Sequence, residues 1–372
     1  MKSKIPSKEK IGQVDFVLLI IIMSLMLFGF VMLFSASAPK AANGGIYNTL
    51  IRQGAILVLG IATLAFSVTQ DYHIYKKYKR PLVLGTAVVM VLVPLIGFAS
   101  HGATRQISLG FISFQPSEFA KIVLVIYYAS RFSNKNTQNL TTDKENIIRS
   151  FGVMIGFCAT CILQKHMSAA IVLALISIMM MLVAGFSLKL TAIGGTILAA
   201  AASLFIFTEE YRANRIIALF KPFEHKQGIG WQIVQSLFAV GSGGLFGLGL
   251  GQSRQKYRYL PEAQNDYIYA VICEELGFIG GIAVIGLFVL FVWRGMSIAL
   301  KAKDKFGMYM AFGITSIIGL QMLINIGVVL SVLPSTGMQL PLFSSGGSSM
   351  IATMWGMGIL LNISKTSRVK KI

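Results

Sequence analysis

The stretch FVLLIIIMSLMLFGFVMLF, residues 16–34, decides the fold of this chain. None of its 19 residues is charged. As a helix that rises about 1.5 Å per residue it is about 28 Å long, close to the hydrocarbon thickness of a bilayer. Similar stretches recur along the chain, and the sequence therefore predicts an all-α, polytopic membrane protein with about ten transmembrane helices. The other nine predicted spans are roughly residues 50–68, 82–100, 116–131, 147–163, 168–186, 190–207, 267–293, 307–332 and 346–364.

The composition agrees with this fold class. Of the 372 residues, 55% are hydrophobic and 13% are charged, whereas a soluble globular chain carries about 25% charged residues. An ordinary soluble enzyme is therefore excluded. A disordered chain is excluded as well, because disorder requires low hydrophobicity. We expect a single membrane domain over residues 1–372.

The formal net charge of +19 follows the predicted topology. Most of the 33 Lys and Arg residues lie in alternate segments, including the N-terminus, residues 76–80, residues 131–149, residues 294–305 and the C-terminus. Lys and Arg in short loops stay on the cytoplasmic side. We therefore expect both termini in the cytoplasm, localisation in a cell membrane, and no nucleic-acid partner.

One long loop, residues 208–265, joins the seventh and eighth predicted spans on the outer side. Long loops of this kind are usually functional or disordered. This loop is basic although it lies outside, which favours a surface for an anionic group such as a pyrophosphate. The alternative is that long loops escape the charge rule. Its basic residues are Arg212, Arg215, Lys221, Lys226, Arg254, Lys256 and Arg258.

A glycine-rich stretch, residues 241–251, lies within the same loop. It holds six glycines in eleven residues. Backbone N–H groups there could approach an anion, or the stretch could pack closely as a re-entrant segment. The sequence leaves both interpretations open.

Asp266 stands where the long loop enters the eighth span. Asn265 or Asp266 could simply cap that helix. Alternatively, Asp266 is a carboxylate at the outer membrane surface beside a basic loop, placed for chemistry. From the residues alone the two interpretations are equal.

Two further polar features interrupt the apolar pattern. Glu118 and Lys121 are three residues apart at the start of the fourth span, which predicts an ion pair on one helix face. Ionisable groups within a span are candidates for function, although a lysine near the interface can also reach solvent harmlessly. Residues 333–349 are uncharged and rich in Pro, Gly and Ser. Irregular backbone at such depth indicates a polar cleft inside the protein.

Taken together, these residues resemble the SEDS family (shape, elongation, division and sporulation), which includes FtsW, RodA and SpoVE. The resemblance covers nearly the whole chain. Its motifs are residues 34–37, 52–53, 115–118 with Lys121, Tyr211-Arg212 with Arg215, 230–237, 249–256, 259–262, Asp266, 274–277 and Pro341 with 345–349.

This resemblance implies a peptidoglycan glycosyltransferase that polymerises lipid II into glycan strands and releases undecaprenyl pyrophosphate. It implies a class B penicillin-binding protein and other divisome proteins as partners. The essential aspartate of the family falls on Asp266. The amino-acid sequence of residues 249–256 is closer to that of the division and sporulation branch of the family than to that of elongation RodA. The substrate-binding residues that we predict are Glu118, Lys121, Arg105, Arg212, Arg215, Arg254, Lys256, Glu262 and Ser345.

The chain departs from the family's pattern at several positions. Asn265 stands where a Thr is frequent, and residues 164–168 read Gln-Lys-His-Met-Ser in place of Gln-Pro-Asp-Leu-Gly. Gln106 replaces a Trp, and Ser345 replaces a Tyr. A carboxylate at position 166 therefore cannot be carried over.

Glycosyl transfer from a lipid pyrophosphate needs a base for the acceptor hydroxyl and positive charge for the leaving group. Asp266 could be that base, or it could hold a divalent cation such as Mg²⁺ or Mn²⁺. No cofactor follows from the sequence with certainty. The alternatives are a lipid II flippase, a solute transporter, and an elongation or sporulation polymerase. A flippase needs a path to the inner face, but the polar groups cluster outside.

Overall fold

The computed structural model describes residues 12–41, 46–96, 98–100, 103–108, 113–134, 143–207, 210–225, 227–257, 259–261 and 263–367. These residues form thirteen helices and three short strands. Ten of the described helices have 17 or more residues and coincide with the ten predicted spans: α1 (Phe16–Ala41), α2 (Ile46–Thr69), α4 (Lys79–Ile96), α5 (Pro116–Phe132), α6 (Lys144–Leu163), α7 (Met167–Val183), α8 (Leu188–Phe207), α11 (Ile268–Leu300), α12 (Lys305–Val329) and α13 (Gly347–Ser364).

Five segments of these helices are each long and apolar enough to cross a membrane alone: Phe16–Ala38, Ile51–Thr69, Lys144–Leu163, Ile268–Leu300 and Lys305–Val329. Others are shorter or carry polar residues. Helix α7 is apolar but has 17 residues, and α5 contains Glu118 and Lys121. Both pack on α12 inside the bundle, so protein rather than lipid surrounds much of their surface.

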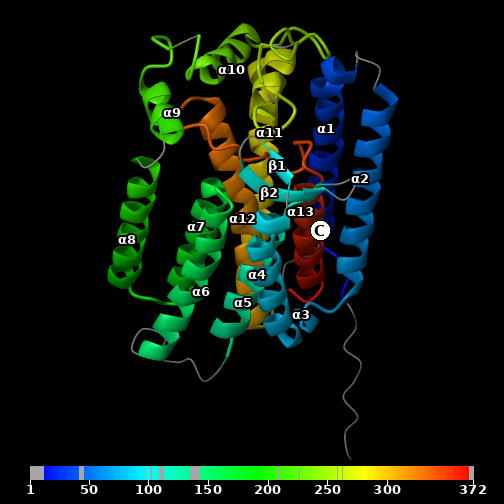
Figure 1. The fold of residues 1–372 in the computed structure, drawn as a ribbon. Coiled ribbons are helices and arrows are strands. Elements are labelled where there is room, and N and C mark those ends of the chain that lie inside the picture. Colours follow the sequence, from blue (N-terminus) through cyan, green and yellow to red (C-terminus); the bar gives the residue numbers. More distant parts are fainter. Residues whose placement is uncertain are drawn as a thin grey trace, which may run out of the picture.

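The bundle has two distinct ends (Figure 1). The short helices α9 (Glu210–Phe220) and α10 (Trp231–Ser242) lie at the top, which we call the loop end, and α3 (Ile74–Lys77) lies at the bottom, the basic end. At the basic end the Asp15 backbone N–H donates to Ser364 Oγ (3.0 Å), and Arg294 forms a buried ion pair with Asp15 (2.7 Å). The start of α1 and the end of α13 therefore lie together, as an even number of spans requires.

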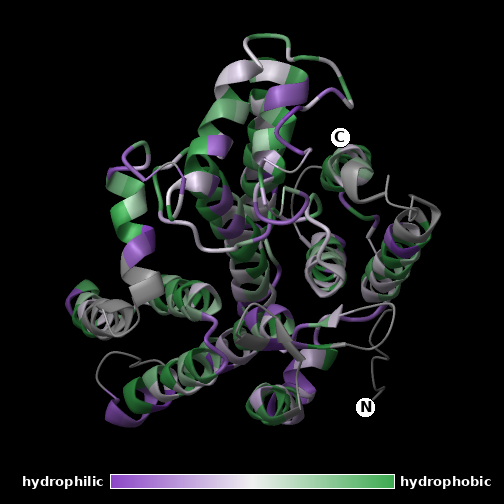
Figure 2. Cartoon of the chain, turned by 45° about the horizontal axis from the view of Figure 1, so that its top comes forward, coloured by the Kyte–Doolittle hydropathy of each residue, from purple (hydrophilic) through white to green (hydrophobic). Residues whose placement is uncertain are grey.

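The helices bury a continuous apolar core. Helix α13 packs on α2, α12 packs on α5 and α11, and α1 packs on α11. Fully buried aromatic rings lie inside the bundle, among them Tyr128, Phe288, Phe306 and Phe343. Figure 2 shows hydrophobic residues along the helices and hydrophilic residues mostly in the connections. Many large apolar side chains, such as Leu27, Val58 and Leu95, remain exposed on the outside of the bundle, as a lipid-facing surface requires.

The structure differs from the sequence-based prediction at two places near the loop end. The third predicted span ends at residue 100, but α4 ends at Ile96 and a small antiparallel sheet follows. Its strands are β1 (Phe98–Ser100), β2 (Ala103–Ser108) and β3 (Ser113–Phe114), in the order β1-β2-β3. The alternation of residues 103–108 is too short to identify a strand beside long apolar runs.

The second difference lies in the eighth span, which is broken. Gly277 has φ 68° and ψ −166°, so α11 consists of a short piece, residues 268–276, and a long piece, residues 278–300. A left-handed φ of this kind is tolerated by glycine and strained for other residues. Asp266 therefore precedes a short helical piece that the break at Gly277 separates from the rest of α11.

The orientation stays a prediction that cysteine labelling tests. All three native cysteines are free and buried, so a cysteine-free background is available by conservative replacement. A cysteine at Lys221, which is exposed at the loop end, is expected to react with a membrane-impermeant thiol reagent in intact cells. Cysteines at Lys77 and Lys144, both exposed at the basic end, are expected to react only after the membrane is opened. The reverse pattern would invert the topology.

Candidate functional site

The site is organised by the connection between α12 and α13, residues 330–346, which we call the α12–α13 loop. It is uncharged, and side chains from α7, α9 and α12 donate hydrogen bonds to its backbone carbonyls. Ser168 Oγ, at the start of α7, donates to the carbonyl of Thr336. Asn325 Nδ2, near the end of α12, donates to the carbonyl of Met338 (2.7 Å). This is the irregular, protein-lined segment that the sequence predicts.

Asp266 is held against this loop. Asn325 Nδ2 also donates to the Asp266 carbonyl (2.8 Å), so one buried amide joins both segments. Oδ2 of Asp266 lies 3.4 Å from the place a Cβ would occupy on Gly337, whose φ is +69°. The helix N-cap is Tyr267, whose side chain makes no capping bond. Asp266 is therefore not the N-cap residue of α11, which favours the chemical interpretation over the capping one.

Residues before Asp266 are fixed by the end of the same loop. Ser344 Oγ donates to the carbonyl of Asn265 (2.5 Å), and Ser345 Oγ donates to the Asn265 side-chain oxygen. The Ser345 N–H donates to the carbonyl of Gln264 (3.2 Å). Ser345, a predicted substrate-binding residue, thus lies beside Asp266 in the chain's fold. In this structure its hydroxyl orients Asn265.

Arg215 brings positive charge to this region. Its guanidinium, on α9, donates to the carbonyl of Ser335 (2.7 Å), two residues before Gly337. Asp266 and Arg215 therefore contact the same short segment. A carboxylate and a cation held at one loop are the pair that acceptor activation and leaving-group stabilisation require.

Glu118 and Lys121 form the predicted ion pair on α5. The Nζ–Oε2 distance is 2.7 Å, and the side chains are 11% and 3% exposed. Ser349, at the start of α13, lies close to Glu118. A small pocket of about 10 Å³, room for about one water molecule, lies beside the pair between α5, α12 and α13, and its lining includes Gln321 and Thr353. Since α13 continues directly from the α12–α13 loop, the pair faces the same end of the fold as Asp266.

His166 and Arg105 complete this side of the site. The Nδ1 atom of His166 lies 3.3 Å from Ser117 Oγ, one residue before Glu118. Arg105, on β2, donates to the carbonyl of Lys165 (3.2 Å). Burial, followed by the charge of Arg105, lowers the pKa of His166 to about 3. His166 is therefore neutral at physiological pH and acts as a hydrogen-bonding group.

The glycine-rich stretch packs against the broken helix. The N–H groups of Leu248 and Gly249 donate to the carbonyls of Glu274 and Glu275 (both 3.0 Å), and the N–H of Phe278 donates to the carbonyl of Gly244 (2.8 Å). A Cβ on Gly247 would lie 2.1 Å from the Glu275 carbonyl oxygen. These contacts support close backbone packing. They also use N–H groups that an anion site would need.

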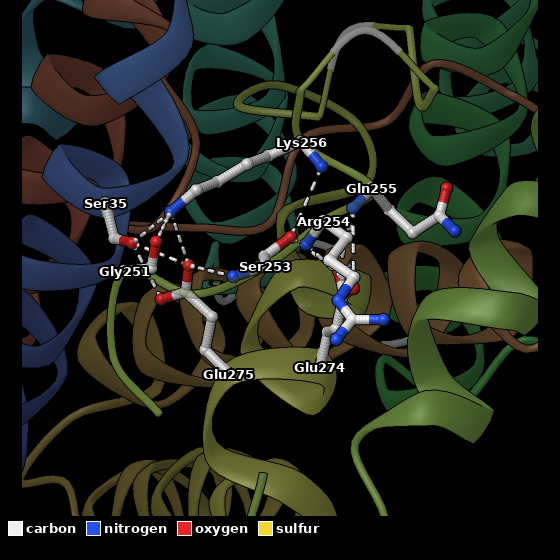
Figure 3. A network of polar contacts seen from close by, with 8 residues as sticks. All are labelled: Ser35, Gly251, Ser253, Arg254, Gln255, Lys256, Glu274 and Glu275. Carbon is white, nitrogen blue, oxygen red and sulfur yellow. Dashed lines mark hydrogen bonds and ion pairs between the residues drawn. The ribbon is translucent and has the colours of Figure 1, made fainter. Parts of the chain in front are cut away.

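Arg254 and Lys256 lie at the other end of residues 268–276, a helical segment about 12 Å long at 1.5 Å per residue. The backbone N–H of Arg254 donates to Glu274 (2.9 Å), and the Arg254 side chain is exposed. Lys256 is buried and forms an ion pair with Glu275 (2.7 Å; Figure 3). The structure thus places Lys256 inside the protein rather than on a substrate-facing surface.

Two predicted site residues lie outside this description. Glu262 is not among the described residues, and for Arg212 only the α9 backbone is described. No group of three or more His, Cys, Asp or Glu residues that could hold a metal occurs within the described residues. The residues that sequence reasoning missed are Gly337 and Ser168. Neither carries a chemical signal in the sequence. Gly337 acts through its backbone conformation, and the hydroxyl of Ser168 donates to the carbonyl of Thr336, which is distant in the sequence.

Comparison with known proteins identifies relatives along the whole chain. Residues 16–369 match the family model FTSW_RODA_SPOVE, described as a cell cycle protein. The chain is 37% identical to stage V sporulation protein E of Bacillus subtilis over 358 residues, which cover 95% of this chain and 98% of the relative. It is also 37% identical to a probable peptidoglycan glycosyltransferase FtsW of Geobacter over 360 residues, covering 95% and 97%.

Solved structures share the fold. One belongs to a study of the structural coordination of polymerization and crosslinking by a peptidoglycan synthase complex, with TM-score 0.78, 25% identity, and coverage of 94% of this chain and 97% of that one. The rod shape determining protein RodA of Thermus thermophilus matches with TM-score 0.72 and 24% identity, over 95% and 98% of the chains.

Proposed function

Since the chain belongs to the FtsW, RodA and SpoVE family of cell cycle proteins, we propose that it extends glycan strands by using lipid II as its substrate. The chain is a peptidoglycan glycosyltransferase and a multi-pass protein of a bacterial membrane. Two curated relatives at 37% identity are named for division and for sporulation. We propose septal or related wall synthesis as its role.

The observation that carries this proposal is the position of Asp266. Its backbone is fixed by Asn325, its carboxylate lies against Gly337, and Arg215 contacts the same loop. In the reaction, the acceptor hydroxyl oxygen forms a bond to the anomeric carbon, and the bond from that carbon to the pyrophosphate breaks. Asp266 accepts the hydroxyl proton, and the pyrophosphate leaves on its polyprenyl carrier. Basic side chains near the loop stabilise the departing charge.

A divalent cation fits this site in part. Two buried oxygens near Asp266, Asn325 Oδ1 and Thr336 Oγ1, have no hydrogen-bond partner, and Mg²⁺ takes one or two carboxylates together with waters and substrate phosphates. Asp266, Asn325 and Thr336 would hold the ion, which would stabilise the pyrophosphate charge. The described residues supply one carboxylate there, so affinity would depend on the substrate.

The partner that we propose is a class B penicillin-binding protein, with other divisome proteins around it. This proposal is supported by the structural relative from a complex that coordinates polymerization and crosslinking. The transpeptidase would crosslink strands as they leave the loop end.

The test is strand synthesis from labelled lipid II by purified protein, with and without the transpeptidase. Long glycan products are expected, and they should be sensitive to a muramidase. Absence of polymer with any partner, together with movement of lipid II across vesicle membranes, would overturn the proposal in favour of a flippase.

A further inference from the structure

The segment of residues 268–276 connects Asp266 to a buried polar network. Asp266 precedes its first turn, and Glu274 and Glu275 lie in its last turn, before the break at Gly277. The exposed fractions of Glu274 and Glu275 are 1% and 0%. The location of Asp266 therefore depends on what holds this far end.

Lys256 neutralises Glu275 inside the protein. Its Nζ atom donates to Glu275 (2.7 Å), to the carbonyl of Gly251 (2.8 Å) and to Ser35 Oγ on α1 (3.1 Å; Figure 3). An ammonium group has three N–H donors, and these three contacts use all of them. The side chains of Lys256 and Glu275 are both 0% exposed. In this arrangement Lys256 has no donor left for a pyrophosphate.

The remaining acceptors of the two carboxylates are also used. Ser35 Oγ donates to Glu275 (2.7 Å), as does the N–H of Ser253 (3.3 Å). Glu274 accepts hydrogen bonds from Ser253 Oγ (2.5 Å) and from the backbone N–H of Arg254 (2.9 Å). The network thus joins α1, the outer loop and the end of the Asp266 segment.

We propose that Lys256 is a positioning residue: with Ser35, Glu274 and Glu275 it forms a buried clamp that fixes residues 268–276 and thereby Asp266. This inference deepens the proposed function and rests on it for the reaction that is measured. It replaces the sequence-based assignment of Lys256 to pyrophosphate binding with a role inside the protein.

The two roles differ in how substitutions combine. Removing one member of a buried ion pair leaves an uncompensated charge, whereas neutralising both members can restore stability. A clamp therefore predicts strong coupling between Lys256 and Glu275. If Lys256 instead binds the pyrophosphate, replacing Lys256 should raise the KM for lipid II and lower activity, whichever residue occupies position 275.

The experiment is a double-mutant cycle on the full chain with its transpeptidase partner. The variants are Lys256→Met, Glu275→Gln and the pair. We expect each single change to lower Tm and to reduce kcat at least about tenfold, with KM for lipid II within about twofold. The double variant should recover to within about threefold of the wild-type rate. A double variant no better than Lys256→Met, or a raised KM that Glu275→Gln does not relieve, would overturn the clamp.

Matched controls come from the same loop. The pair Lys221–Glu224 has a similar separation (3.0 Å), but its side chains are 61% and 62% exposed, so Glu224→Gln should leave Tm and rate unchanged. The side chain of Arg254 is exposed, so the effects of Arg254→Met and Glu275→Gln on Tm should be additive, without coupling. The double-mutant cycle on Tm requires no enzymatic activity, so it tests the clamp even if the wild-type protein makes no polymer. Absence of polymer would contradict the proposed function and not the clamp.

Discussion

Replacing Asp266 with Asn is expected to reduce the rate of glycan-strand growth by at least about a hundredfold, the lower end for loss of a general acid–base group. The change preserves the side chain's shape and removes its basicity. The fold should survive, because the contact that fixes residue 266 is its backbone carbonyl, bound by Asn325 (2.8 Å). The measurement is initial polymerisation from labelled lipid II, alongside Tm and binding of the transpeptidase.

The control is the same chemical change at the other end of the bundle. Asp71 is an exposed carboxylate that contacts His73 at the basic end, and Asp71→Asn should polymerise at the wild-type rate. Repeating the Asp266→Asn assay across Mg²⁺ and Mn²⁺ concentrations separates the two roles of Asp266. Recovery at high metal would indicate a ligand, and no recovery would indicate a base. Undiminished strand growth would remove Asp266 from the mechanism.

Much of the fold follows from the sequence because the bilayer restricts what a chain can do. An apolar run of about 20 residues can satisfy its backbone in lipid only as a helix, and the ten predicted spans coincide with described helices of the structure. The outer segments follow a different rule. The break at Gly277 depends on close backbone contacts with residues 245–247, which leave no periodic signal. The three strands β1, β2 and β3 pair with their neighbours along the chain but are too short to show a clear alternation.

The candidate site was predictable where chemistry and helix periodicity coincide. The Glu118–Lys121 pair follows from spacing on one helix, and its ion pair is confirmed. Lys256 shows the limit of such reasoning. A basic residue in a basic outer loop indicates an anion site, yet its partner, Glu275, lies 19 residues away and is buried with it. The sequence gives the sign of the charge on a side chain, but whether that side chain can reach a ligand depends on its burial in the fold.

The structure shows what contacts are made by the residues that depart from the family's pattern. Asn265 and Ser345 stand where the family often has Thr and Tyr, and the two side chains contact each other. The two departures from the family's pattern are therefore in contact with each other, in the turn beside Asp266. His166, where the family has a carboxylate, contacts Ser117 as a neutral group. We expect these differences to adjust substrate contacts while the position of Asp266 is kept.

The second large effect is expected at Lys121. Lys121→Met should reduce polymerisation by about a hundredfold or more, the lower end for loss of one group that stabilises charge in a reaction. It should also destabilise the fold by about 3–5 kcal/mol, because Glu118 is left buried and uncompensated. The exposed fraction of the Lys121 side chain is 3%, and its Nζ atom lies 2.7 Å from Glu118. A lysine that merely reached toward solvent would show neither feature. Membrane yield and Tm should fall together with activity if the loss is one of packing.

The charge swap Glu118→Lys with Lys121→Glu separates packing from chemistry. If the two groups mainly support each other, the swapped pair restores Tm and part of the activity, since the i,i+3 spacing allows the bond in either direction. If Lys121 also stabilises the pyrophosphate, Tm recovers while kcat stays low, because the swap moves the cation from position 121 to position 118, about one helical turn along α5. Full activity of Lys121→Met alone would exclude both roles, and the site would then rest on Asp266 and the loop that holds it.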